Sequence, residues 1–346
     1  MKKLFALVAL SLFLVPQLSA QAPKTEKPAA EKPKTPPPQA TPRPTAGAIR
    51  ESAQKQLGEK VEIKWDQSYA GNENPKQQVD VYLPKTRNSD KPLPCVVFIH
   101  GGGWSGGDRK GYASQAGQLA ASGDYAAVSV GYRLSGEVKW PAQIYDCKAA
   151  IRYIRGHAKE WNIDPDRIGV TGSSAGGHLV TLLGLTGGNK DLEGDIGEYT
   201  SQKSDVRCVV NFCGPTDMGA PLMQGAAAKV DDPAVSGLVG GPLKDNADKV
   251  KACSPLTYVS KSAVPIMTVH GTADMRVDFA NAEKLEAAMK KAGAPHLLIA
   301  VTNAGHGIPV GPELAGRIKQ FWDLHLRDMK SEIAATPIEV REPEKK

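Results

Sequence analysis

The chain has 346 residues, 41% of them hydrophobic, so it is long enough to bury one large core. Its formal net charge is +6, but residues 1–50 hold eight Lys or Arg and two Glu and therefore carry all of it. The rest of the chain is neutral in sum, which argues against nucleic-acid binding by the folded part.

Residues 1–20 have the pattern of a secretory signal peptide. Two lysines precede an apolar run over residues 4–15, and Leu18-Ser19-Ala20 offers a small-residue cleavage site. The run is too short to span a membrane, and the absence of any cysteine before Cys95 argues against a lipid-anchored lipoprotein. We therefore expect an exported bacterial protein, periplasmic or extracellular, with no transmembrane segment after signal cleavage.

Residues 21–47 form a proline-rich segment that holds eight of the 26 prolines and almost no apolar side chains. Such a segment cannot pack a core, and we predict a disordered, extended linker. Residues 48–330 are predicted to form one folded domain, whose catalytic motifs are described below. Residues 331–346 are predicted to be a disordered C-terminal tail.

Short apolar runs and helical patterns alternate along the predicted domain. Eight strands are predicted at about 61–65, 78–83, 95–99, 126–130, 167–171, 206–212, 264–269 and 296–301. The clearest helical runs are 143–155, 176–185, 280–292 and 312–324. Antiparallel strands followed by βαβ units predict an α/β fold with a mostly parallel, doubly wound sheet of eight strands. Two glycine- and charge-rich stretches, 187–204 and 219–250, are predicted to be short cap insertions on the active-site side.

The first motif follows the apolar strand at 95–99 and reads His100-Gly101-Gly102-Gly103-Trp104. Three glycines at a strand end allow the backbone N–H groups to point into a cavity, where they can stabilise the negative charge of an acyl-transfer transition state. We predict that Gly102, Gly103 and Ala175 supply these donors and that His100 holds the loop. The alternatives are a loop without a ligand and a phosphate cradle, although the G-K-[ST] ending of a nucleotide loop is missing.

The second motif is Gly172-Ser173-Ser174-Ala175-Gly176, between an apolar strand and a helical run. Strand, sharp turn and helix are the context of a nucleophile elbow, which lifts the central hydroxyl clear of the sheet. Ser174 is therefore the predicted nucleophile. The simpler alternative is a turn of small residues between a strand and a helix.

Two further residues follow in the order serine, acid, histidine. Asp274 ends the His270-Gly271-Thr272-Ala273-Asp274 turn after the strand at 264–269, and His306 lies between two glycines after the strand at 296–301. His306 would take the proton of the serine hydroxyl, and Asp274 would orient the imidazole. Asp217 and Asp278 are the two competing candidates for the acid.

Together these motifs resemble the α/β-hydrolase superfamily. They are most similar to its secreted bacterial esterases of the hormone-sensitive-lipase and bacterial feruloyl and acetyl-xylan esterase type. Connecting segments agree over about residues 60–326, in particular Tyr132-Arg133-Leu134, Trp140-Pro141-Ala142-Gln143, Asp164-Pro165-Asp166-Arg167-Ile168 and Ser254-Pro255-Leu256-Thr257-Tyr258-Val259. The chain departs from the family where the acid turn, usually D-x-x-V-P, reads Asp274-Met275-Arg276-Val277-Asp278.

The resemblance implies a serine carboxylic-ester hydrolase acting on short-chain acyl or hydroxycinnamoyl esters, either small molecules or esters linked to polysaccharide. Trp104, Met218 and Met223 are candidate substrate-binding residues, with ordinary packing as the alternative. One rival is a non-catalytic glycan or cell-wall binding protein on the same fold. Another is a prolyl-oligopeptidase-like peptidase, for which the chain lacks the length of a propeller.

No pattern of metal ligands is visible, and we predict neither a metal nor another cofactor. The five cysteines are sparse and odd in number, so they do not indicate a disulfide framework. The sequence does not indicate an oligomeric state.

Overall fold

The computed structural model describes residues 45–223 and 228–340. The predicted signal peptide and most of the proline-rich linker, residues 1–44, lie outside the described residues. The described residues contain no helix with the length and apolar character needed to cross a bilayer.

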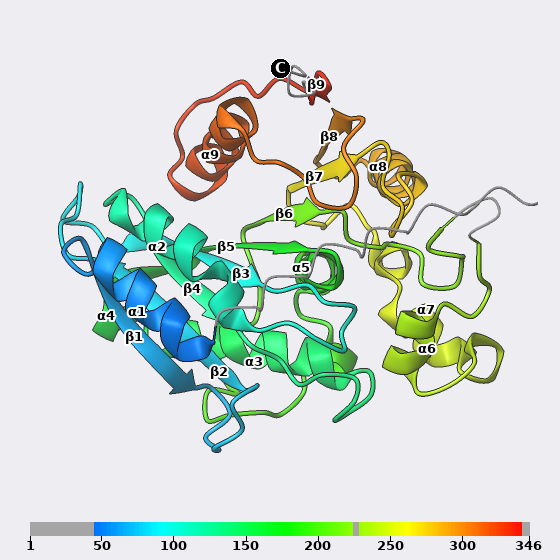
Figure 1. The fold of residues 1–346 in the computed structure, drawn as a ribbon, viewed down its shortest axis with the longest axis horizontal. Helices are drawn as coiled ribbons and strands as arrows, with labels where there is room; N and C mark the ends of the chain where they lie inside the picture. The colour runs from blue at the N-terminus through cyan, green and yellow to red at the C-terminus, as the bar shows by residue number, and fades with distance from the viewer. Residues whose placement is uncertain (1–44, 224–227, 341–346) are drawn as a thin grey trace, which may run out of the picture. The chain divides into compact units, whose positions relative to one another are not determined.

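A nine-stranded sheet forms the centre of the fold, in the order β1-β2-β4-β3-β5-β6-β7-β8-β9 (Figure 1). The strand pairs β1–β2 and β2–β4 are antiparallel, and all the others are parallel, which confirms the predicted mostly parallel sheet. The strands are β1 (Val61–Ser68), β2 (Gln78–Pro84), β3 (Leu93–Ile99), β4 (Ala126–Val130), β5 (Ile163–Ser173), β6 (Cys208–Phe212), β7 (Ile266–Gly271), β8 (His296–Thr302) and β9 (Ile338–Glu339).

Helices cover both faces of the sheet because the central strands are apolar on both sides. One face packs against α1 (Ala46–Leu57), α2 (Ala113–Ala121) and α9 (Pro312–Leu326). The other face packs against α3 (Ala142–Gly156), α5 (Ala175–Leu185) and α8 (Ala280–Ala292). Shorter helices are α4 (Ala158–Trp161), α6 (Pro233–Val239) and α7 (Ala247–Cys253).

The four clearest predicted helices are confirmed as α3, α5, α8 and α9. Helix α1 was not predicted, and it begins at Ala46, inside the segment assigned to the linker. The side chain of Thr45 caps it by accepting a hydrogen bond from the N–H of Ala48 at 3.2 Å. The folded part of the chain therefore starts slightly before residue 48.

The predicted disordered tail is wrong for residues 331–340. Ile338 and Glu339 form β9, which pairs in parallel with the end of β8 and adds the ninth strand. The guanidinium of Arg317 in α9 donates to the carbonyl oxygens of Ala334 and Thr336, at 3.0 and 2.5 Å. Ile333 and Ile338 pack against the core beneath α9, so long-range contacts order a segment whose own sequence has no strong preference.

Residues 187–204 contribute no side chain to the pocket described below. The segment follows α5 and lies against α3, where Oη of Tyr145 donates to the carbonyl oxygen of Asp191 at 3.0 Å. There Glu193 pairs with two cations of α3, Lys148 at 2.7 Å and Arg152 at 3.1 Å. This segment therefore covers buried charges of α3, whereas the 219–250 insertion contributes Leu222, Asp232 and Ala234 to the pocket described below.

Candidate active site

Ser174 occupies a strained turn between β5 and α5. Its backbone angles are φ 57° and ψ −120°, a region that non-glycine residues rarely adopt. The turn is held by the N–H of Ser174, which donates to the carbonyl oxygen of Phe212 at 2.8 Å. The flanking glycines are required by close approach, because a Cβ atom on Gly172 or Gly176 would lie 2.7 or 2.1 Å from the carbonyl oxygen of Ile99.

The glycine loop after β3 faces Ser174 from across the same pocket. Gly102 and Gly103 have φ values of 115° and 58°, which explains why this position in the chain needs glycine. Among the described residues, the N–H groups of Gly102, Gly103 and Ala175 have no hydrogen-bond acceptor. Ala175 is the first residue of α5, so its N–H belongs to the positive end of a helix. Three unpaired donors beside one hydroxyl group suit an oxyanion.

Two buried histidines hold the glycine loop rather than face a ligand. The His100 ring stacks on Tyr132 and its Nδ1 lies 2.8 Å from the carbonyl oxygen of Gly101, while burial lowers its pKa to about 4. Nε1 of Trp104 donates to Nδ1 of His178 at 3.2 Å, and Nε2 of His178 lies 2.6 Å from the carbonyl oxygen of Cys253. His178 is therefore a neutral tautomer that fixes the Trp104 end of the loop.

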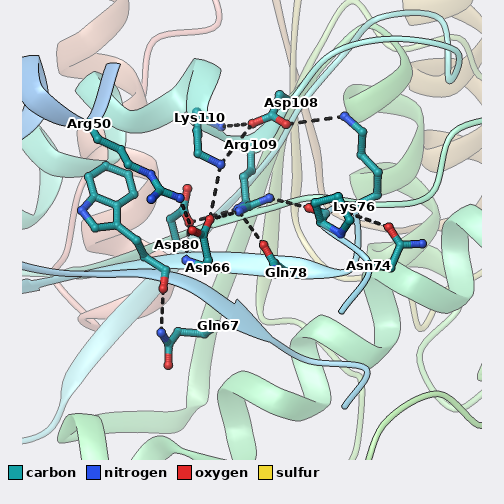
Figure 2. Close-up of polar contacts among 12 residues, drawn as sticks. Arg50, Asp66, Gln67, Asn74, Lys76, Gln78, Asp80, Asp108, Arg109 and Lys110 are labelled. Atoms are coloured by element: carbon teal, nitrogen blue, oxygen red, sulfur yellow. Dashed lines mark hydrogen bonds and ion pairs between the residues drawn. The ribbon is translucent and has the colours of Figure 1, made fainter. Parts of the chain in front are cut away.

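A network of ion pairs and hydrogen bonds around Arg109, drawn in Figure 2, follows the glycine loop in the chain. Arg109 is 1% exposed and its Nε donates to Oδ1 of Asp80, also buried, at 3.0 Å. Its guanidinium also contacts Asp66 and Gln78. Lys76 donates to the carbonyl oxygen of Gly107 at 3.2 Å, so the network ties the loop to β1 and β2.

His306 and Asp274 form a hydrogen-bonded pair at the carboxyl ends of β7 and β8. Nδ1 of His306 donates to Oδ2 of Asp274 at 2.7 Å, and Oδ1 accepts from the N–H groups of Arg276 and Val277 at 2.8 and 3.0 Å. Burial alone would raise the pKa of Asp274, but hydrogen bonds from His270, His306 and the backbone hold it well below its usual range. Burial would lower the pKa of His306, but its contacts with Asp274 and Cys213 raise it above the ordinary value.

The two competing acids form their contacts with residues other than His306. Asp217 pairs with Lys284 at 2.9 Å. The carboxylate of Asp278 accepts from the N–H of Ala280 at the start of α8. Of the three candidate acids, Asp274 is the one hydrogen-bonded to His306.

One pocket of about 550 Å³ contains the glycine loop, Ser174 and His306. Trp104 lines it, as predicted from the sequence. Met218 does not, because its side chain is fully buried in the core and only its N–H is bonded, to Oγ of Ser254. Met223 is half-buried and is not among the residues that line this pocket.

Sequence reasoning missed four residues around this pocket. Asp232 and Arg276 line it. His270 is fully buried, with Nε2 3.3 Å from Oδ2 of Asp274. Cys213 donates from Sγ to the carbonyl oxygen of His306 at 3.4 Å.

All five cysteines are buried and free. Within the described ranges, one group of three residues has potential metal-ligand atoms within 4.8 Å of one another, and it consists of Cys213, Asp274 and His306. Two of these three, Asp274 and His306, are the hydrogen-bonded pair described above.

Comparison with known proteins shows that the likeness extends over most of the chain. Esterase LipC of Mycobacterium tuberculosis is 29% identical over 238 residues, which are 68% of this chain and 58% of that protein. Carboxylesterase NlhH of the same species is 41% identical over 105 residues, 30% of this chain and 32% of NlhH. This chain spans about half the length of the first curated relatives that it matches.

Solved structures agree with this fold. A truncated form of a carbohydrate esterase from gut microbiota has a TM-score of 0.72 at 32% identity, covering 78% of this chain and 97% of that one. An acetyl ester-xyloside bifunctional hydrolase from Caldicellulosiruptor lactoaceticus has a TM-score of 0.58 at 26% identity, covering 75% of this chain and 90% of that one. The family model described as BD-FAE matches residues 79–289, from β2 through most of α8. The chain therefore belongs to the BD-FAE family and has the α/β-hydrolase fold.

Proposed function

We propose that this protein is a serine carboxylic-ester hydrolase. The observation that carries the proposal is the single pocket that contains Ser174, the unpaired donors of the glycine loop and His306, with His306 bonded to Asp274. The esterase relatives and structural neighbours support the same reaction class.

In the proposed mechanism, His306 takes the hydroxyl proton of Ser174 as its oxygen attacks the ester carbonyl. The N–H groups of Gly102, Gly103 and Ala175 stabilise the resulting oxyanion. Asp274 orients the imidazole and stabilises its cation. His306 then protonates the departing alcohol, and a water molecule, activated by the same histidine, hydrolyses the acyl-enzyme. The reaction needs no metal or other cofactor.

For substrates, we propose short-chain acyl and hydroxycinnamoyl esters, including acetyl groups on polysaccharide. The similarity to a carbohydrate esterase and to an acetyl ester-xyloside hydrolase supports this class. A panel of p-nitrophenyl acetate through decanoate, methyl ferulate and acetylated xylan tests it. We expect acetate or butyrate to be the best p-nitrophenyl ester, and a clear preference for decanoate would contradict the proposal.

The nucleophile is tested by Ser174→Ala, which should lower kcat on p-nitrophenyl acetate roughly 10⁴-fold or more. Ser173→Ala is the matched control and should cost far less, because the Ser173 hydroxyl has only a 4.0 Å contact with Sγ of Cys213. Near-full activity of Ser174→Ala would exclude the mechanism.

A non-catalytic glycan-binding protein is the alternative that needs a separate test. A fluorophosphonate probe forms an adduct with an activated serine, and we expect this adduct on Ser174. Binding of glycan without any adduct would favour the non-catalytic alternative.

We also propose export after cleavage following Ala20, which N-terminal sequencing of the mature protein from a bacterial host would test.

A further inference from the structure

Arg276 places a cation in the same pocket as the nucleophile. Arg276 is exposed and is among the residues that line the pocket with Ser174 and His306. Its N–H donates to Oδ1 of Asp274 at 2.8 Å, so the backbone that carries the guanidinium is fixed next to the His306–Asp274 pair. In the part of the chain that the structure describes, the guanidinium itself forms no hydrogen bond and has no carboxylate within 4.0 Å.

The neighbouring carboxylates are engaged in other contacts. Asp274 is buried and accepts hydrogen bonds from His306, His270 and the backbone. Asp232 also lines the pocket, but its Oδ1 caps α6 by accepting from the N–H groups of Ala234 and Val235 at 2.9 and 3.3 Å. The fork of donors on Arg276 therefore remains available for a ligand.

We propose that Arg276 binds a carboxylate on the alcohol part of the ester substrate. This inference rests on the proposed ester hydrolysis and adds a substrate class to it. The alcohol leaves from the side of His306, which protonates it, and Arg276 belongs to the turn whose Asp274 holds that histidine. A planar guanidinium matches a carboxylate with two parallel hydrogen bonds, which makes it selective for this group.

The substrate class that follows is an acyl ester of a hydroxy acid. Acylated uronic acids and acylated hydroxybenzoates share this chemistry. The bond broken is the ester C–O bond in both cases, with water as the co-reactant, so the carboxylate takes part in binding alone.

The test compares 4-acetoxybenzoate with its neutral amide, 4-acetoxybenzamide. The ratio of their kcat/KM values is measured for the wild-type protein and for Arg276→Gln. We expect the anionic-to-neutral ratio to fall about tenfold in the variant, the size of one charge-assisted hydrogen-bonding interaction in a half-open pocket. The two esters differ in intrinsic reactivity, but this difference is the same for both proteins. A change in the ratio of kcat/KM values between wild type and variant therefore reports the Arg276 side chain alone.

Three further variants sharpen the result. Arg276→Lys keeps the charge but loses the paired donors of the guanidinium, so it should retain part of the preference for the anionic ester. Asp232→Asn keeps the helix cap but removes a nearby negative charge, so it should raise the ratio. Lys190→Gln changes the net charge by the same amount as Arg276→Gln, but Lys190 does not line the pocket, so the ratio should stay unchanged.

Added salt should lower the wild-type ratio, because an exposed charge pair is screened. An unchanged ratio in Arg276→Gln would overturn the inference while leaving the esterase proposal intact. Absence of hydrolysis of both esters and of p-nitrophenyl acetate would instead overturn the proposed function. A parallel comparison of O-acetylated glucuronic acid with O-acetylated glucose shows whether the protein also prefers the anionic ester when the alcohol part is a sugar.

Discussion

His270 donates toward the same carboxylate oxygen that binds His306. Its Nε2 lies 3.3 Å from Oδ2 of Asp274 and 2.8 Å from the carbonyl oxygen of Val277. Both partners are acceptors, so Nε2 carries the proton. The ring is fully buried, and its edge packs on Phe279. His270 is thus a positioning residue for the turn that holds Asp274.

We predict that His270→Ala lowers kcat by roughly tenfold to a hundredfold through misplacement of the His306–Asp274 pair, with a smaller change in KM. Loss of the donor should also cost about 1–3 kcal/mol of the free energy of unfolding, because it leaves buried acceptors unpaired. Steady-state kinetics with a pH profile separates the two effects. A variant that is less stable but has wild-type kcat and pH dependence would show a purely structural role.

The pH dependence of activity should follow His306. The base must be neutral to accept a proton, and Asp274 raises the pKa of the imidazole above its ordinary value. We therefore expect kcat/KM to rise with pH and to reach half its maximum above about pH 6.5, the ordinary histidine value. An acidic optimum would contradict this assignment.

Asp274→Asn tests the acid directly. It removes the charge that stabilises the imidazolium and disturbs the tautomer of His306, so kcat should fall roughly 10⁴-fold and the apparent pKa of kcat/KM should move down. Asp217→Asn is the control, because Asp217 pairs with Lys284 instead of His306. If Asp217→Asn proved the crippling change, the acid would lie after β6.

Among the contacts that support the glycine loop, the Arg109–Asp80 pair should contribute most to the free energy of unfolding. Asp80→Ala leaves a buried guanidinium with fewer partners, and we predict a loss of about 3 kcal/mol in the free energy of unfolding, measured by denaturant titration. Glu62→Ala breaks an exposed pair with Lys64 and should cost less than about 0.5 kcal/mol. Equal effects of the two variants would show that burial of the Arg109 pair does not matter.

Deletion of residues 331–346 should destabilise the domain, although the sequence predicts a disordered tail. The deletion removes β9, exposes apolar surface near α9 and removes hydrogen-bond acceptors of Arg317. We therefore expect the free energy of unfolding to fall by about 2 kcal/mol. Deletion of residues 341–346 alone leaves β9 and these contacts in place. A melting temperature unchanged by the longer deletion would contradict the packing described for this segment.

The sequence alone determined the features that depend on local backbone demands. The elbow around Ser174 and the glycine loop were predictable because a strand, a sharp turn and close approach to Ile99 need glycine at fixed spacing. The order of strands and helices followed from hydrophobic periodicity, which is also local. The positions of His306 and Asp274 followed from their places just after predicted strands.

Only the tertiary structure decided the features that depend on long-range partners. Residues 187–204 lie against α3 because Glu193 neutralises two buried cations there, and residues 331–340 are ordered by β8 and Arg317. His270 and Arg276 carry no distinctive local pattern. Their proximity to the site arises because parallel strands bring their carboxyl ends together, and that arrangement depends on pairing between segments far apart in the chain.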